Sequence, residues 1–278
     1  MLKIHFLNVG KGNCTVIKFP SGNLAVVDID NSRVKDKNGT LQDPLLFLDQ
    51  EYPNQSIFRF VLSHPDMDHM SGLSELHRDR AITNFWDSDN NKEVDVDKLH
   101  LGGYDPDDWY KYQELRVKDE NPKAIKLYQG EEAQSYWKED GIKILGPSKL
   151  MVEKANETEE YNHCSYVLKI EYEGVKVILG GDATKESWRD ILEHHGEEEL
   201  SADVFLAPHH GSPDNIEKDV FKYISPQYVV VSDHRGHNYD YSYYDDLASE
   251  QVYSTKHFGN ITLEVSDTVK TIFPEKNG

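Results

Sequence analysis

The sequence contains few cysteines, and their placement limits the kinds of site it can build. Only Cys14 and Cys164 occur in 278 residues, and both lie in apolar, strand-like contexts. A disulfide framework or a thiolate-rich zinc site needs more cysteines or a closely spaced pair. We therefore expect two reduced, buried thiols.

Long apolar runs are also missing. No stretch of about 18 apolar residues occurs, so we expect no transmembrane helix and no membrane partner. The first six residues, Met1-Leu2-Lys3-Ile4-His5-Phe6, run straight into a strand-like pattern. They lack the charged start, apolar stretch and cleavage site of a signal peptide, so we expect a cytoplasmic protein.

Basic residues are outnumbered by acidic ones. The chain carries 30 Lys and Arg against 50 Asp and Glu, a formal net charge of −20. Proteins that follow a long nucleic-acid backbone normally present a basic face. The overall field here would repel a long polyanion, although bound cations can offset the charge locally. The composition therefore favours a small or short anionic substrate over a long duplex.

Short apolar segments separated by turns predict an α/β protein. The pattern indicates strands at 2–6, 15–19, 24–28, 58–63, 142–145, 165–172, 175–179, 204–207 and 228–232, and a helix at 185–194. Two similar halves of this kind predict two sheets packed together with helices outside. Residues 1–278 are interpreted as one domain, in which an irregular, acidic and aromatic insertion covers about 84–140. We expect its aromatic side chains, and the tyrosines at 239–244, to pack against the body; base stacking is the alternative.

Four of the predicted strands end in polar residues that can bind metal. These residues are His64, Asp182, His209 and the group Asp233, His234 and His237. Strand ends and the loops beyond them are where rigid scaffolds place reactive groups.

The densest cluster is His64, Asp66, Asp68 and His69, which precedes Gly72. In a tightly turned loop, His64 and Asp66 can point one way while Asp68 and His69 point another. That arrangement serves two neighbouring cations, and mixed imidazole and carboxylate ligands suit zinc, manganese or iron better than calcium.

Other candidates are weaker when taken alone. Asp182 follows Gly180-Gly181 and could bridge two metals or simply cap the next helix. His209 and His210 end a strand, so one ring can bind metal while the other contacts substrate; the alternative is a pair of solvated histidines. His163 and His237 remain open as further ligands.

Taken in order, these motifs resemble the metallo-β-lactamase superfamily. The segment His64-x-Asp66-x-Asp68-His69 resembles its metal-binding signature, and the fuller pattern is similar to the hydrolase domain of ComEC-type competence proteins and their stand-alone relatives. The similar segments occur in the family's order over nearly the whole chain: 8–13, 27–28, 64–72, 162–168, 180–182, 208–212 and 236–237.

The resemblance implies a four-layer αββα metallo-β-lactamase sandwich that holds two divalent metal ions, Zn or Mn. It implies one ion bound by His64 and Asp66 with a further histidine such as His237. The second ion is bound by Asp68, His69 and His209, and Asp182 bridges the two. A hydroxide between the ions would attack the substrate, oriented by Asp68, while His210 contacts the substrate or donates a proton to the leaving group.

We expect a phosphodiesterase or nuclease that acts on a small or short phosphodiester, with single-stranded nucleic acid as a further candidate substrate and a protein partner left open. A phosphate substrate requires cations near the site, and Lys11, Lys185 and Arg235 are nearest in sequence. Two alternatives stay open: hydrolysis of a non-phosphate ester, lactone or thioester, and a non-catalytic regulatory module of the same fold.

Overall fold

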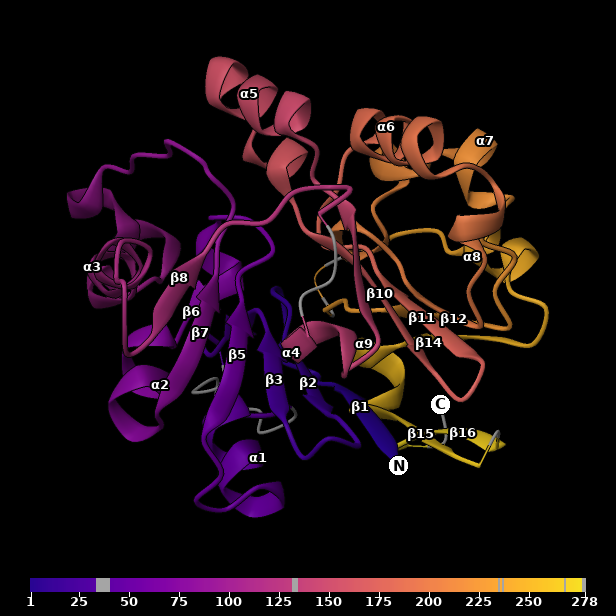
Figure 1. Ribbon diagram of the computed structural model, residues 1–278, viewed down its shortest axis with the longest axis horizontal. Coiled ribbons are helices and arrows are strands. Elements are labelled where there is room, and N and C mark those ends of the chain that lie inside the picture. The colour runs from indigo at the N-terminus through magenta and orange to yellow at the C-terminus, as the bar shows by residue number, and fades with distance from the viewer. Residues whose placement is uncertain (34–40, 132–134, 235, 237, 268, 277–278) are drawn as a thin grey trace.

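Two sheets packed face to face form the centre of the protein, and helices cover their outer faces (Figure 1). The computed structural model describes residues 1–33, 41–131, 135–234, 236, 238–267 and 269–276. In spatial order, the eight-stranded sheet consists of β16 (Val269–Pro274), β15 (Ile261–Ser266), β1 (Leu2–Phe6), β2 (Thr15–Lys18), β3 (Leu24–Val27), β5 (Ile57–Val61), β7 (Ile82–Trp86) and β8 (Lys123–Ile125). The six-stranded sheet consists of β14 (Gln251–Ser254), β13 (Tyr228–Val231), β12 (Val204–Leu206), β11 (Val175–Leu179), β10 (Val167–Tyr172) and β9 (Ile142–Gly146). A short ribbon pairs β4 (Ile29–Asp30) with β6 (Met70–Ser71).

The helices fall into groups according to the sheet they cover. The eight-stranded sheet is covered by α1 (Pro44–Glu51), α2 (Leu73–Asp79) and α3 (Pro106–Leu115), and the six-stranded sheet by α6 (Lys185–His195), α7 (Lys218–Phe221) and α8 (Ser242–Leu247). The remaining helices are α4 (Ser135–Lys138), α5 (Lys149–Thr158) and α9 (Thr255–Phe258). The short 3₁₀ helices are η1 (Met67–His69), η2 (Val96–Gly102), η3 (Tyr161–Cys164), η4 (Glu198–Leu200), η5 (His209–Gly211) and η6 (Pro213–Asn215).

Alternation along the central strands fills both sides of each sheet. In β11, Val177 and Leu179 face the core between the sheets, while Ile178 packs toward the outer helices. Since successive side chains of a strand point to opposite faces, a strand buried on both faces must be apolar throughout. This explains the continuous apolar runs of β11, β12 and β13 and confirms the predicted αββα layering.

Parallel pairing brings several strand ends to the same edge. In the eight-stranded sheet β3, β5, β7 and β8 run parallel, and in the other sheet β11, β12, β13 and β14 do so. The carboxyl ends of parallel strands meet at one edge of a sheet, where ligands commonly bind. Polar residues that follow these strands are therefore brought together although they are distant in the sequence.

The expectation of irregular structure across about 84–140 is wrong for much of that segment. It contains part of β7, all of β8 and the ten-residue helix α3, which begins after Asp105 with Pro106 in its first turn. Asp105 accepts a hydrogen bond from the backbone of Asp107, as a helix N-cap does. Among the aromatic residues of this segment, Trp86, Trp109, Tyr112 and Trp137 are buried, as the packing interpretation expected, whereas Tyr110 is exposed.

Both cysteines are unpaired and buried, which confirms the expected reduced thiols. Among the described residues, no helix is long and apolar enough to cross a bilayer.

Candidate metal centre

The candidate site lies beyond the carboxyl ends of parallel strands from both sheets. His64 comes soon after β5, and Asp182 comes soon after β11. His69 lies in η1, on the same loop as His64, and His209 and His210 begin η5 beyond β12. The two sheets therefore contribute different ligands to one centre.

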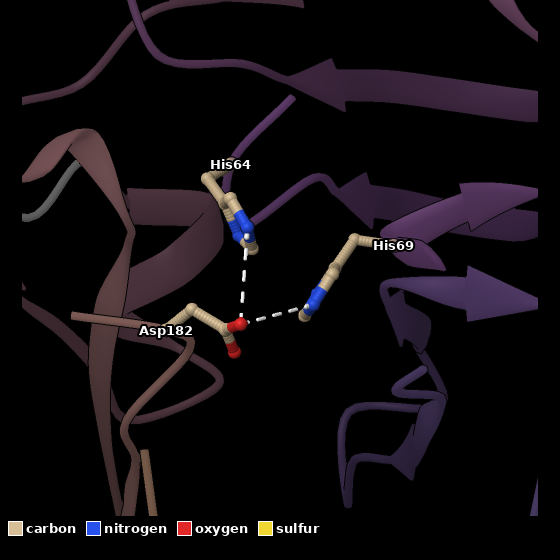
Figure 2. A group of neighbouring side chains, drawn as sticks. All are labelled: His64, His69 and Asp182. Atoms are coloured by element: carbon tan, nitrogen blue, oxygen red, sulfur yellow. Dashed lines mark ion pairs between the residues drawn. The ribbon is translucent and has the colours of Figure 1, made fainter. Parts of the chain in front are cut away.

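Two imidazoles from one sheet face a carboxylate from the other. Figure 2 shows His64 and His69 directed toward Asp182. The Oδ2 atom of Asp182 is 3.9 Å from Nε2 of His64 and 3.5 Å from Nε2 of His69. One potential ligand atom of each residue lies within 4.8 Å of the others, and all three side chains are buried. This spacing allows the three groups to hold one metal ion.

A second group shares His69 with the first. Asp68, His69 and His210 also have potential ligand atoms within 4.8 Å of one another. Nε2 of His210 lies 3.6 Å from Oδ2 of Asp182. The carboxylate of Asp182 therefore borders both groups, as a bridging ligand would.

Four buried polar atoms in this centre have no hydrogen-bond partner among the described residues. They are Nε2 of His64, His69 and His210, and Oδ1 of Asp182. Buried polar atoms are nearly always satisfied, and leaving one unpaired costs about 1–3 kcal/mol. Unpartnered atoms gathered around Asp182 in this way fit bound cations, which would satisfy them. The donor set is the mixed imidazole and carboxylate type that suits zinc or manganese.

A buried carboxylate orients His69. Oδ2 of Asp28 lies 2.8 Å from Nδ1 of His69 and also accepts a hydrogen bond of 2.7 Å from the Ser63 hydroxyl. The backbone N–H of Ser63 donates to Oδ1 of Asp28 at 2.7 Å. Because the Asp28 carboxylate accepts this hydrogen bond, Nδ1 of His69 carries a proton, and Nε2 is the ring nitrogen that faces the centre and can bind a metal.

The other two imidazoles are held in the same way. Nδ1 of His210 donates to the backbone carbonyl of Ser232 at 3.2 Å. Nδ1 of His64 lies 3.1 Å from Oγ of Ser63. Because the Ser63 hydroxyl donates its proton to Asp28, Nδ1 of His64 is the donor in this contact. All three rings therefore direct Nε2 inward, which is the arrangement expected of metal ligands with fixed tautomers.

Three residues of the site have left-handed backbone conformations. The φ angles are 58° at Asp28, 50° at His209 and 56° at His210. Non-glycine residues rarely adopt this region, and they do so mostly where surrounding structure and function demand it. The nearby Gly12 permits a close backbone approach, because a Cβ there would lie 1.9 Å from the carbonyl oxygen of Asp68.

Charges inside the centre compensate one another. Burial disfavours a charged His69, but the carboxylates of Asp182 and Asp28 outweigh it and raise the pKa of His69 well above its ordinary value. Burial also opposes the charge of Asp182, yet His69 and His210 hold the pKa of Asp182 well below its usual range. Burial lowers the pKa of His210. The centre thus favours an ionised Asp182 and a neutral His210, the forms that bind metal.

Two lysines lie beside the remaining carboxylates. Nζ of Lys11 is 3.2 Å from Oδ2 of Asp68, and Lys92 forms an ion pair with Asp66. Oδ2 of Asp66 lies 3.7 Å from Nε2 of His64, so Asp66 borders the centre without belonging to either group of three. The site therefore carries positive charge at its edge in a strongly acidic protein.

His209 and His210 occupy different environments. The side chain of His210 is buried, whereas that of His209 is 37% exposed. Nδ1 of His209 is hydrogen-bonded to Oδ1 of Asn215 at 2.8 Å, and its Nε2 lies 3.9 Å from Oδ2 of Asp182. His210 thus lies inside the centre and His209 at its rim.

The other candidates are placed as follows. Nδ1 of His163 is 2.8 Å from Oγ1 of Thr184, and His163 belongs to neither group of three. Asp233 is held by Lys256 and by the Tyr241 hydroxyl. His237, the expected further ligand, lies outside the described residues. Thr184, not Asp182, caps the following helix α6.

Sequence reasoning missed the roles of Asp28 and Lys92. Asp28 follows an apolar strand, the same signal that marked the other four strand ends, and could have been found by it. Lys92 lies in an irregular loop whose sequence shows no pattern that connects it to the site.

Solved structures share this architecture. No family model and no curated protein matches the sequence. The chain is similar to Igni18, a metallo hydrolase from the archaeon Ignicoccus hospitalis, with 13% identity and a TM-score of 0.53 over 95% of this chain and 100% of that one. It is similar to the metallo-β-lactamase fold protein YhfI from Bacillus subtilis, with 12% identity and a TM-score of 0.54 over the same shares. It is also similar to the Zn²⁺-bound PqqB from Methylobacterium extorquens, with 9% identity and a TM-score of 0.51 over 95% of this chain and 100% of that one.

The layered sheets and these similarities define a protein with the metallo-β-lactamase fold. Identities this low establish the fold alone, so the chemistry has to be argued from the residues of this chain.

Proposed function

We propose that this protein is a metal-dependent hydrolase that cleaves phosphodiester bonds. The observation that carries the proposal is the convergence of four buried, unpartnered ligand atoms, from His64, His69, His210 and Asp182. The motif resemblance to ComEC-type hydrolase domains supports it, as does the similarity to a metallo hydrolase and to a Zn²⁺-bound protein of the same fold.

In this proposal two divalent cations, zinc or manganese, are held in the centre. His64 and Asp182, with Asp66 beside them, would hold one; Asp68, His69 and His210 would hold the other, with Asp182 shared. When bound, such ions would supply Lewis acidity and lower the pKa of a coordinated water toward 7.

The proposed roles of His209 and His210 are exchanged relative to the expectation from sequence. His210 is buried and offers an unpartnered Nε2, which favours a ligand. His209 is partly exposed and is anchored through Nδ1 to Asn215, so its Nε2 is accessible from solvent. We assign to His209 the contact with substrate or the donation of a proton to the leaving group, because this role requires a side chain that a substrate can reach from solvent.

Lys11 and Lys92 favour a phosphate over a neutral ester. The ammonium group of Lys11 lies beside the proposed ligand Asp68, and that of Lys92 lies beside Asp66 at the border of the centre. A phosphodiester brings a negative charge that they can stabilise, whereas a lactone or thioester brings none. The net charge of −20 makes local cations of this kind necessary for any anionic substrate.

The test combines metal content with turnover of two model substrates. Protein loaded with zinc or manganese is analysed for bound metal and assayed on bis-p-nitrophenyl phosphate and on p-nitrophenyl acetate, with Asp68→Ala as the inactive control. We expect two metals and hydrolysis of the phosphodiester. Turnover of the acetate alone would refute the phosphodiester assignment, and metal binding without any turnover would support a regulatory module.

The lysines provide a second arm of the same experiment. Lys11→Met and Lys92→Met should raise KM for the phosphodiester about tenfold, because each removes a charge-assisted contact. The exposed Lys143, which pairs with Glu199 at 2.6 Å, provides the matched control Lys143→Met. An unchanged KM in both site variants would contradict their role in phosphate binding.

A further inference from the structure

A cavity lies among the helices that cover the outer side of the six-stranded sheet. Its volume is about 520 Å³, and its lining includes Lys185, Arg189, Lys218, Tyr243, Pro213 and Ile216. Lys185 and Arg189 lie in α6, Lys218 in α7 and Tyr243 in α8, and these three helices gather on one side of the molecule in Figure 1. We call it the basic cavity.

The basic residues of this cavity are not all neutralised by its acidic residues. Arg189 pairs with the buried Glu217 at 2.6 Å, and Asp240 accepts a hydrogen bond from the backbone of Ser242. Lys218 lies 5.4 Å from the centroid of the Tyr243 ring.

Lys185 is only partly exposed. Within the described part of the chain it has no hydrogen bond and no ion pair. It is also the first residue of α6, where the helix dipole favours anions and disfavours a lysine. An anion bound in the cavity would satisfy Lys185 and compensate for its unfavourable position.

Two of the segments that line the cavity follow closely in sequence after proposed metal ligands. Lys185 is three residues beyond Asp182, which limits their backbone separation to about 11 Å. Asn215, which lies between the lining residues Pro213 and Ile216, accepts a hydrogen bond from Nδ1 of His209 and donates to the carbonyl of Ala183 at 3.4 Å, and so ties η6 to the segment before α6. A group in the cavity is therefore within reach of a neighbouring group held at the metal centre in the same molecule.

A second cavity provides a contrast. It measures about 480 Å³, adjoins Tyr104 beside Lys11, and is lined by Glu75, Asp105 and Asp108. No lysine or arginine is among its described lining residues. Of these two cavities, the basic one is suited to an anion.

We propose that the basic cavity binds a second phosphate of the substrate, next to the one that is cleaved. This inference rests on the proposed function and narrows it to substrates that carry at least two phosphate groups. Lys185 and Lys218 would contact the second phosphate, while Tyr243, Ile216 and Pro213 would pack against the organic group attached to it.

A matched pair of substrates tests the proposal. Thymidine 5′-(p-nitrophenyl phosphate) has one phosphodiester, and the same compound with a 3′-phosphate adds the second anionic group. We expect the added phosphate to lower KM about tenfold, as one charge-assisted contact does. In Lys185→Gln and Lys218→Gln this advantage should shrink or vanish. The control variant Lys222→Gln should keep this advantage, because Lys222 is an exposed lysine directly after α7 that pairs with Asp219 and does not line the cavity. Equal KM values for the two substrates, or an advantage that survives in the double variant, would overturn the proposal.

A binding measurement separates this inference from the proposed activity. Inorganic phosphate is titrated by calorimetry into the protein kept free of metal with EDTA, and Lys185→Gln should bind it more weakly than Lys222→Gln does. If bis-p-nitrophenyl phosphate is not hydrolysed but this difference appears, the anion site stands and the proposed function falls. If the phosphodiester is hydrolysed and the difference is missing, the function stands and the anion site falls.

Discussion

Replacing Asp28 with asparagine would put a hydrogen-bond donor where His69 requires an acceptor. The carboxylate now accepts from Nδ1 of His69 at 2.8 Å and from the hydroxyl and backbone N–H of Ser63, each at 2.7 Å. Asparagine has nearly the same shape and tolerates the φ of 58° at this position. Its oxygen can keep the bond to the backbone of Ser63, which leaves its NH₂ group facing Nδ1–H of His69.

Two donors cannot share that contact, so His69 must move its proton to Nε2 or lose its orientation. A proton on Nε2 occupies the lone pair that we assign to the metal. Loss of such an outer hydrogen-bond partner typically weakens metal binding by about 10–100-fold. This corresponds to about 1.4–2.7 kcal/mol of binding free energy.

The assay is competition for zinc between the protein and a chromogenic chelator. Asp108→Asn serves as the control, because Asp108 is also buried and accepts two backbone hydrogen bonds, from Gly72 and Ser74, without touching a proposed ligand. Thermal unfolding in EDTA checks that both variants fold. Wild-type zinc affinity in a folded Asp28→Asn protein would refute the argument that Asp28 sets the tautomer of His69.

Three further predictions follow from other parts of the structure. His210→Ala should reduce bound metal more than His209→Ala does, as measured by elemental analysis, because of these two histidines only His210 offers a buried, unpartnered Nε2. The opposite order would favour His209 as the ligand, as the sequence predicted. EDTA should destabilise the protein, and zinc at about 100 times its Kd should raise the free energy of unfolding by about 2.7 kcal/mol in urea titrations, with little response in His69→Ala. Burial lowers the pKa of His5 to about 4, so the unfolded chain, with an ordinary value of 6.5, takes up this proton first as the pH falls. The free energy of unfolding is therefore unaffected by His5 above pH 6.5 and falls by up to about 3 kcal/mol toward pH 4. His5→Gln should flatten this part of the curve of unfolding free energy against pH. Parallel curves for the variant and the wild type would contradict the lowered pKa of His5.

The sequence was sufficient for the layered fold and for most of the metal loop. Apolar runs bounded by turns located the central strands to within one or two residues, because strands buried on both faces allow little else. It failed for the segment that contains α3, since Trp109 and Tyr112 bury only two aromatic rings among many acidic residues and the apolar period is weak. There the helix is stabilised by its Asp105 cap and by packing against α2, which sequence periodicity does not register.

What the sequence alone determined is the set of residue types at strand ends: imidazoles and carboxylates whose order along the chain indicated a metal-binding hydrolase fold. Which of two adjacent histidines is buried, which carboxylate orients His69, and which lysines lie beside the acids were decided only by tertiary structure. The reason is physical, because burial, tautomer and ion pairing depend on contacts between residues as far apart as Asp28 and His69 or His210 and Ser232. A strand pattern specifies where a side chain leaves the sheet, but only the packing of the two sheets specifies what it meets.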